Sequence, residues 1–172
     1  IENISKIIVK VDQLIKKIKP DGFLILGDTN SSLSAISEKK NKIPIFHIEA
    51  GNRCFNDVVP EEINRKIVDH ISDINLTYSN FARNNLLNEG LKPDRIFKIG
   101  SPLFEVINDN KNKMKINYYL KKNKLKKNQF ILLSFHREEN IDNNKNISNF
   151  IKILENLNKE YKLPILVSTH PR

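Results

Sequence analysis

Residues 23–29 read Phe-Leu-Ile-Leu-Gly-Asp-Thr, a pattern that indicates the fold class. Four consecutive apolar residues make a run of the length typical of a strand that is covered on both faces, as in a parallel sheet. The run stops at Gly-Asp-Thr, which is a turn signal. We therefore predict a buried parallel strand over 23–26, with candidate functional residues directly after it.

The sequence on either side of this strand alternates between helical and strand-like patterns. Apolar residues recur at helical spacing from Ile4 to Ile18, and Pro-Asp-Gly at 20–22 ends that helix. A second helix runs through Glu38, and further elements are predicted downstream: strand 43–48, helix 60–71, strand 74–77, helix 79–88 and strand 95–99. This alternation is typical of an α/β fold and predicts a parallel sheet with helices on both faces.

A second α/β unit begins after a stretch rich in lysine and asparagine. Residues 130–135 are predicted to form a strand, followed by a helix through Asn158 and a further strand over 163–168. The absence of an initiating methionine and the abrupt end at Arg172 indicate a chain that is cut at both ends. Both halves of the fold are therefore expected to be incomplete in this chain.

The predicted domain boundary falls where apolar periodicity lapses and charge dominates. Residues 1–107 are assigned to a first α/β unit, and residues 128–172 to the start of a second. Residues 108–127 between them are predicted to be a basic, solvated linker, because such a composition buries too little apolar area to order itself.

The formal net charge of +9 suggests a nucleic-acid-binding protein as one reading of this chain. The lysines, however, concentrate in residues 111–127, and no ladder of aromatic residues accompanies them. A solvated linker is therefore favoured over a tail that binds polyanions. We predict no nucleic-acid partner.

Cysteine usage and hydropathy point to the cytoplasm. Cys54 is the single cysteine, so the chain forms no internal disulfide and has no second thiol for a zinc site. No stretch approaches the roughly 18 uninterrupted apolar residues of a membrane span. Residues 1–10 lack the order of a signal peptide. These features predict a cytoplasmic protein with no membrane partner.

Acidic residues stand at or near the strand ends, where ligands bind in open parallel α/β sheets. Asp28 follows the first predicted strand, Glu49 follows the second, and Glu61 opens a helix beside Glu62. Carboxylates that converge on one cleft can share protons and push their pKa values apart. Such a cluster is suited to acid and base roles near neutral pH.

Each of these carboxylates also has a purely structural explanation. Asp28 or Thr29 would cap the helix that follows. Glu61 would be a first-turn acid that pairs with Arg65 one turn on. Glu49 has no helix to cap and would lose solvation if buried, so a functional role is favoured there.

The first strand of the second unit ends at His136 and Arg137, whose side chains supply donors suited to a diphosphate. The alternative is a polar loop whose Arg and Glu residues pair with one another. Gly-Ser-Pro at 100–102, which contains Ser101, could likewise be only a turn. No GxGxxG fingerprint, Walker-type loop or metal-ligand spacing is present. The other histidines are interpreted as core or surface residues: His47, His70 and His170.

Taken in order, five motifs resemble the non-hydrolysing UDP-N-acetylglucosamine 2-epimerase family. They are Gly-Asp-Thr at 27–29, His-Ile-Glu-Ala-Gly-Asn-Arg at 47–53, Pro-Glu-Glu-Ile-Asn-Arg at 60–65, Gly-Ser-Pro at 100–102 and His-Arg-Glu-Glu-Asn at 136–140. Two further stretches more closely resemble the branch that makes UDP-N-acetyl-L-fucosamine for capsule and O-antigen sugars: Ala-Gly-Asn-Arg-Cys-Phe at 50–55 and Ile-Val-Asp-His-Ile-Ser-Asp at 67–73.

The resemblance implies two Rossmann-like halves of the glycosyltransferase-B type, with a UDP-sugar between them, and a homodimer. It makes residues 1–107 the C-terminal part of the first Rossmann-like domain and residues 128–172 the start of the second. It implies inversion of C2 of a UDP-N-acetyl amino sugar for cell-surface polysaccharide precursors, by loss of the C2 proton and of UDP followed by their return to the other face. No metal or other cofactor is implied. A weakly acidic C2–H needs a positioned base, and a departing diphosphate needs cationic or N–H stabilisation.

Carried over residue by residue, the resemblance makes Asp28, Glu49 and Glu61 acid/base carboxylates. It makes Arg65 a supporting arginine and His136 the histidine at the UDP end. Arg137 and Ser101 are expected to bind substrate. The family's Gly-Thr-Arg-Pro-Glu-type loop and its Asp-Ser-Gly-Gly-type segment are absent, so this chain alone is expected to be inactive.

Three alternative functions stay open at this point. Two keep the fold: a glycosyltransferase of the same architecture, and a hydrolysing 2-epimerase that releases UDP and free N-acetylmannosamine. The third is a basic nucleic-acid-binding module. The strand-end carboxylates argue against that module because they would repel phosphates.

Overall fold

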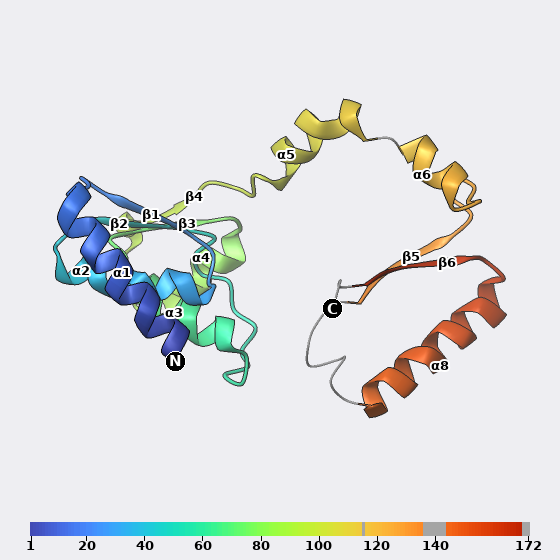
Figure 1. Ribbon diagram of the computed structural model, residues 1–172, viewed down its shortest axis with the longest axis horizontal. Helices are drawn as coiled ribbons and strands as arrows, with labels where there is room; N and C mark the ends of the chain where they lie inside the picture. The colour runs from blue at the N-terminus through green and yellow to red at the C-terminus, as the bar shows by residue number, and fades with distance from the viewer. Residues whose placement is uncertain (115, 136–143, 170–172) are drawn as a thin grey trace. The chain divides into compact units, whose positions relative to one another are not determined.

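The computed structural model describes residues 1–114, 116–135 and 144–169. The chain divides into two compact units, Ile1–Val106 and Ile107–Arg172. The domain limits expected from the sequence stay a prediction. Each unit is described by itself (Figure 1).

The first unit contains a four-stranded sheet in which every neighbouring pair is parallel. Its strands are β1 (Phe23–Leu26), β2 (Ile45–Ile48), β3 (Ile74–Thr77) and β4 (Ile96–Lys98), and they lie side by side in that order. All four coincide with predicted strands to within two residues at each end. Leu26 lies opposite Ile48 in the register, so β1 and β2 end at the same edge of the sheet.

Helices precede and connect these strands. They are α1 (Glu2–Ile18), the 3₁₀ turn η1 (Asn30–Ser34), α2 (Ala35–Lys40), α3 (Pro60–Ile71), α4 (Asn80–Asn88) and the 3₁₀ turn η2 (Pro93–Arg95). Lys19 caps the C-terminal end of α1 with a left-handed backbone (φ 52°), and its N–H donates to the Ile15 carbonyl at 2.7 Å. Ser79 caps α4 by accepting the Ala82 N–H at 3.1 Å. The predicted helix positions are confirmed.

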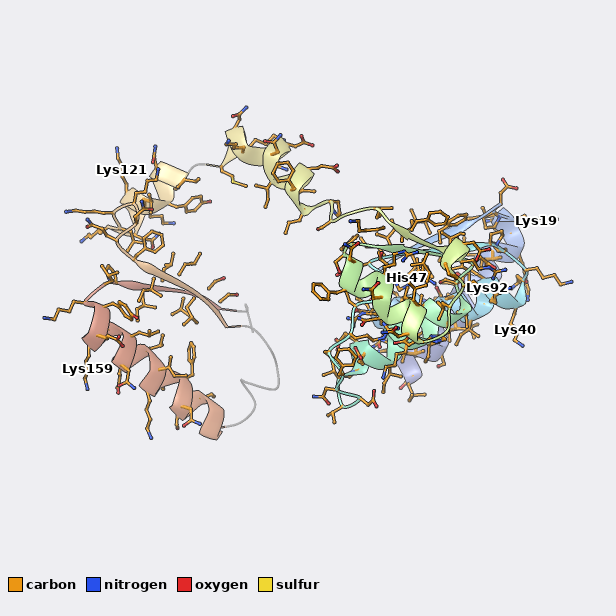
Figure 2. All side chains as sticks on the ribbon, turned by 180° about the vertical axis from the view of Figure 1, so that it is seen from behind. Lys19, Lys40, His47, Lys92, Lys121 and Lys159 are labelled. Atoms are coloured by element: carbon orange, nitrogen blue, oxygen red, sulfur yellow. The ribbon has the colours of Figure 1, made fainter. Side chains whose placement is uncertain are left out.

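The helices of the first unit cover one face of its sheet, as Figures 1 and 2 both show. The buried core on this face includes Ile25, Leu33, Ala35, Ile45 and Val68. On the other face Leu24 and Leu26 remain 63% and 65% exposed within the described residues. The prediction of helices on both faces is therefore wrong for this unit. Right-handed crossovers between strands in sequential order place every connecting helix on the same side.

The second unit contains a two-stranded parallel sheet joined by a helix. Its elements are β5 (Ile131–Phe135), α8 (Asn144–Tyr161) and β6 (Ile165–Thr169), with Ile131 opposite Ile165 in the register. This arrangement confirms the predicted strand, helix and strand. It is the βαβ unit on which Rossmann-like domains are built.

The lysine-rich stretch is largely helical, which corrects the prediction that it does not order itself. It contains the end of α5 (Leu103–Asn110), the 3₁₀ turn η3 (Lys111–Lys113) and α6 (Ile116–Lys122). Nearly all its described residues are exposed, as predicted. Lysine is a good helix former, and Lys121 and Lys122 lie in the last turn of α6, where the helix dipole favours cations. Local helices therefore form without a large buried surface.

Among the helices that the structure describes, none combines the length and the apolar character needed to cross a membrane.

Candidate active site

Asp28 and Glu49 leave the same edge of the first sheet. Gly27 directly follows β1 with φ 75°, and its N–H donates to the Ile48 carbonyl at 3.1 Å. A Cβ placed on Gly27 would lie 3.5 Å from Glu49 Oε2. The Glu49 carboxylate therefore lies against the turn that carries Asp28, as the strand-end argument predicted.

Glu49 itself has a left-handed backbone with φ 71°, which is uncommon for any residue other than glycine. Its side chain is half-buried, and Asn52 Nδ2 approaches Glu49 Oε1 at 3.5 Å. Burial, together with the nearby charge of Glu49, raises the pKa of the Tyr78 hydroxyl. Tyr78 and Asn52 are thus polar neighbours of this carboxylate that sequence reasoning did not identify.

Asp28 forms an ion pair with Arg65, and the two side chains are only 19% and 14% exposed. The second guanidinium nitrogen, Arg65 Nη1, donates to the Asn52 carbonyl at 3.0 Å and to Glu62 Oε2 at 3.1 Å. Thr29 is the N-cap residue of η1 but makes no side-chain cap bond. The explanation that Asp28 or Thr29 caps the following helix is therefore wrong. Arg65 instead joins the turn after β1 to the loop after β2.

Glu61 and Glu62 take different places at the start of α3. Glu61 is exposed, whereas Glu62 is fully buried. Glu62 accepts the N–H groups of Cys54 at 3.0 Å and Phe55 at 3.2 Å. Burial opposes its ionisation, but these hydrogen bonds and the charge of Arg65 outweigh burial and lower the pKa of Glu62. The predicted pairing of Glu61 with Arg65 is wrong, because Arg65 pairs with Glu62 and Asp28.

The spacing of residues along α3 distinguishes the buried Glu62 from the exposed Glu61. Glu62, Arg65 and Asp69 stand at positions i, i+3 and i+7 with the core residue Val68 beside them, so they share the buried face of α3. Glu61 is turned about 100° away from Glu62 around the helix axis. Asn64, also buried, donates to the Asp28 carbonyl at 2.9 Å. Through this hydrogen bond, helix α3 holds the backbone of the turn after β1 in place.

The remaining predicted site residues lie apart from this cluster or outside the described residues. Ser101 is exposed, and its Oγ accepts the Leu103 N–H at 3.3 Å at the start of α5. Its substrate-binding role stays a prediction. His136 and Arg137 fall outside the described residues. The histidines were interpreted only as core or surface residues: His47 is buried, His70 is exposed, and His170 falls outside the described residues.

The arrangement offers two carboxylates with different partners on one sheet edge. Asp28 is balanced by the guanidinium of Arg65, whereas Glu49 is met by the neutral amide of Asn52. Groups that differ in this way can serve a bound molecule as proton donor and acceptor. Across residues 1–114, 116–135 and 144–169, no cluster of three or more His, Cys, Asp or Glu side chains is placed to hold a metal ion.

Sequence comparison relates the whole chain to one group of enzymes. The sequence profile of the UDP-N-acetylglucosamine 2-epimerase family matches residues 1–172. A UDP-N-acetylglucosamine 2-epimerase of Methanocaldococcus jannaschii is 33% identical over 99% of this chain and 48% of its own length. A UDP-2,3-diacetamido-2,3-dideoxy-D-glucuronate 2-epimerase of Pseudomonas aeruginosa is 34% identical over 98% of this chain and 47% of its own. The chain thus spans about half the length of these relatives.

Solved structures give the same result. The UDP-N-acetylglucosamine 2-epimerase of Rickettsia bellii has a TM-score of 0.90 and 48% identity, covering 99% of this chain and 45% of that protein. The Methanocaldococcus jannaschii enzyme in complex with UDP-GlcNAc and UDP has a TM-score of 0.86 and 34% identity, covering 99% of this chain and 48% of that protein. These likenesses confirm the α/β fold of the glycosyltransferase-B type. With its motifs in order, its paired strand-end carboxylates and this profile over its whole length, the chain belongs to the UDP-N-acetylglucosamine 2-epimerase family.

Proposed function

We propose that the full gene product containing this chain is a non-hydrolysing 2-epimerase that inverts C2 of a UDP-N-acetyl amino sugar. The observation that carries the proposal is the meeting of Asp28 and Glu49 at adjacent strand ends, with Arg65 bound to Asp28. Family membership supports it, as do relatives solved with UDP-GlcNAc bound.

The first half of the reaction removes a proton and a leaving group. A carboxylate takes the C2 proton, the C2–H electron pair forms the C1–C2 double bond, and the C1–O bond breaks. UDP departs with that bond's electron pair and leaves a 2-acetamidoglycal. A positioned base of this kind is the usual means of removing a weakly acidic proton.

The second half returns the proton to the opposite face of C2 while a UDP oxygen attacks C1. Inversion therefore needs proton-transfer groups that reach both faces of the sugar ring. Asp28 and Glu49, on neighbouring strands, are the described pair best suited to this task, with Glu61 as the third candidate carried over from the family motif. His136 and Arg137 are proposed to stabilise the departing diphosphate.

The proposal extends to the whole protein's setting. The substrate is UDP-N-acetylglucosamine and its manno epimer, or the 6-deoxy L-sugar analogue, used to make cell-surface polysaccharide precursors. The protein is proposed to act as a cytoplasmic homodimer.

Product analysis of the full gene product tests the reaction type. Incubation with UDP-N-acetylglucosamine, followed by proton NMR, is expected to show UDP-N-acetylmannosamine with no free sugar. Release of UDP with free N-acetylmannosamine would identify a hydrolysing enzyme instead. Turnover that requires a sugar acceptor would identify a glycosyltransferase, and either result overturns the proposal.

A further inference from the structure

A cluster of charged side chains lies buried next to the two carboxylates and is not part of the predicted site. His47 and Asp69 are fully buried, and the Arg53 side chain is also unexposed. The Arg53 guanidinium donates to Asp69 Oδ2 at 2.7 Å and to both Glu89 oxygens at 2.7 and 2.6 Å. Figure 2 shows His47 inside the first unit, whereas Lys19 projects from its surface.

Both ring nitrogens of His47 have a hydrogen-bond partner. His47 Nδ1 lies 2.8 Å from Asp69 Oδ1, and His47 Nε2 lies 2.9 Å from the Gly27 carbonyl. A carbonyl can only accept, so Nε2 carries a hydrogen. Asp69 also accepts from Arg53 and from the Gly51 N–H, so each of its oxygens has a donor besides His47. His47 is therefore held at both ring nitrogens.

The charged groups of the cluster are paired. Arg53 lies between the carboxylates of Asp69 and Glu89, and His47 contacts Asp69. Buried ions are tolerated when they are paired and fully hydrogen-bonded, and removing one partner leaves an uncompensated buried charge. His70 is the further titratable group at the edge of this cluster, with its Nε2 3.8 Å from Glu89.

Asp69 connects this cluster to both carboxylates of the site. Through His47 it holds the Gly27 carbonyl, one residue before Asp28. Directly, its two oxygens accept the Gly51 N–H at 3.3 and 3.2 Å, two residues after Glu49. A non-glycine residue with a left-handed backbone, such as Glu49, keeps that conformation only when several surrounding contacts hold it.

We propose that His47, Asp69 and Arg53 form a buried positioning network that fixes the strand ends carrying Asp28 and Glu49 for proton transfer. None of the three side chains is exposed, so their effect on the reaction is indirect. They act by holding the Gly27 carbonyl and the Gly51 amide in place, so that the two carboxylates keep their spacing. The role in proton transfer rests on the proposed epimerase function, whereas the network itself does not.

The network is tested first by nitrogen-15 NMR of wild-type protein labelled at histidine. The bond to the Gly27 carbonyl requires a hydrogen on Nε2, because a carbonyl can only accept. His47, assigned through its own backbone, is expected to show a bonded hydrogen on Nε2 that exchanges slowly with water. A His47 Nε2 without a hydrogen would overturn the proposal. This measurement needs no variant and no substrate, so it decides the network even if the reaction assigned to the protein is wrong.

Kinetics of the full gene product test the positioning role. Because small displacements of catalytic groups cost up to about 100-fold in rate, Asp69→Asn is expected to lower kcat about 10- to 100-fold while KM for the UDP-sugar stays within about twofold. The matched control is Asp94→Asn, which removes an exposed carboxylate before β4, at the opposite edge of the sheet. It is expected to leave both constants unchanged.

A folded Asp69→Asn protein with wild-type kcat would overturn the proposal. If that variant does not fold, Glu89→Gln is the milder test, because Glu89 is 29% exposed and its loss leaves Arg53 bound to Asp69. It is expected to lower kcat several-fold without changing KM, and an unchanged kcat would count against the network. A wild-type protein inactive on every UDP-N-acetyl amino sugar would instead refute the proposed function.

Discussion

At Glu49 the chain places a charged side chain on a left-handed backbone (φ 71°) at the end of a buried strand. Such a conformation costs a non-glycine residue about 1–3 kcal/mol, and strain of this kind collects at functional sites. The carboxylate that the sequence marked as hardest to explain structurally is thus also the one whose backbone is strained. The identity of the residue was predictable from its place after an apolar run, whereas its φ was not.

Substituting Glu49 separates the backbone strain from the chemistry. Glycine adopts positive φ without the steric penalty that a Cβ brings, so Glu49→Gly is expected to be more stable than Glu49→Ala by about 1 kcal/mol. Both variants are expected to be inactive in the full gene product. Urea denaturation measures the first difference. Equal stability of the two variants would show that the backbone at this position is not strained.

At the scale of the element, Gly51 packs against helix α4. A Cβ on Gly51 would lie 2.2 Å from the Ala82 carbonyl oxygen. The helix backbone blocks any side chain there, and Asn85 of α4 also donates to the Gly51 carbonyl at 2.9 Å. The glycine in the loop after β2 is therefore required by close packing, which its place in a strand-end motif did not reveal.

Gly51→Ala tests this contact, with Gly90→Ala as its control. Both glycines have positive φ, 79° and 87°, but a Cβ on Gly90 meets no atom within 4 Å. Gly90→Ala is expected to cost about 1 kcal/mol for the backbone alone. Gly51→Ala is expected to cost about 1–3 kcal/mol more because of overpacking. Thermal or urea denaturation measures both, and equal losses would contradict the close packing of α4 on this loop.

Helix α2 carries a buried acid, Glu38, that the proposed reaction does not use. Burial raises the pKa of Glu38 above its usual value of 4.5, although its own backbone N–H and the Ser34 hydroxyl act in the other direction. The folded state then holds the proton more tightly than the unfolded state. The stability linked to this proton is fully present below pH 4.5 and is lost as pH rises through the folded-state pKa.

Glu38→Gln removes this ionisation. Its free energy of unfolding is expected to exceed that of the wild type near neutral pH, with the advantage shrinking as pH falls toward 4.5. Glu105→Gln, which changes an exposed acid in the first turn of α5, is expected to show no such pH-dependent advantage. Denaturation at a series of pH values checks both. An advantage for Glu38→Gln that is constant across pH would contradict the buried-acid explanation.

At the scale of the whole molecule, the alternation of elements was predictable because each strand is a short apolar run between helical patterns. Strand 74–77 was placed to the residue. That the helices cover only one face of the sheet was not predictable, because it depends on the order of the strands in the sheet rather than on any single segment. Likewise, Asp28 and Glu49 were predicted as site residues from their positions at strand ends. The pairing of Glu62 with Arg65 was identified only from the buried face of α3.

Isotope exchange at C2 reports on the proposed proton transfer itself. The full gene product is incubated with UDP-N-acetylglucosamine in deuterated water and followed by proton NMR, beside Glu49→Gln and the matched variant Glu2→Gln, which changes an acid 80% exposed on α1. Wild type and Glu2→Gln are predicted to place deuterium at C2 and to form UDP-N-acetylmannosamine, and Glu49→Gln is predicted to do neither. Epimerisation that leaves C2 free of deuterium, or full exchange by Glu49→Gln, would contradict proton transfer by this carboxylate.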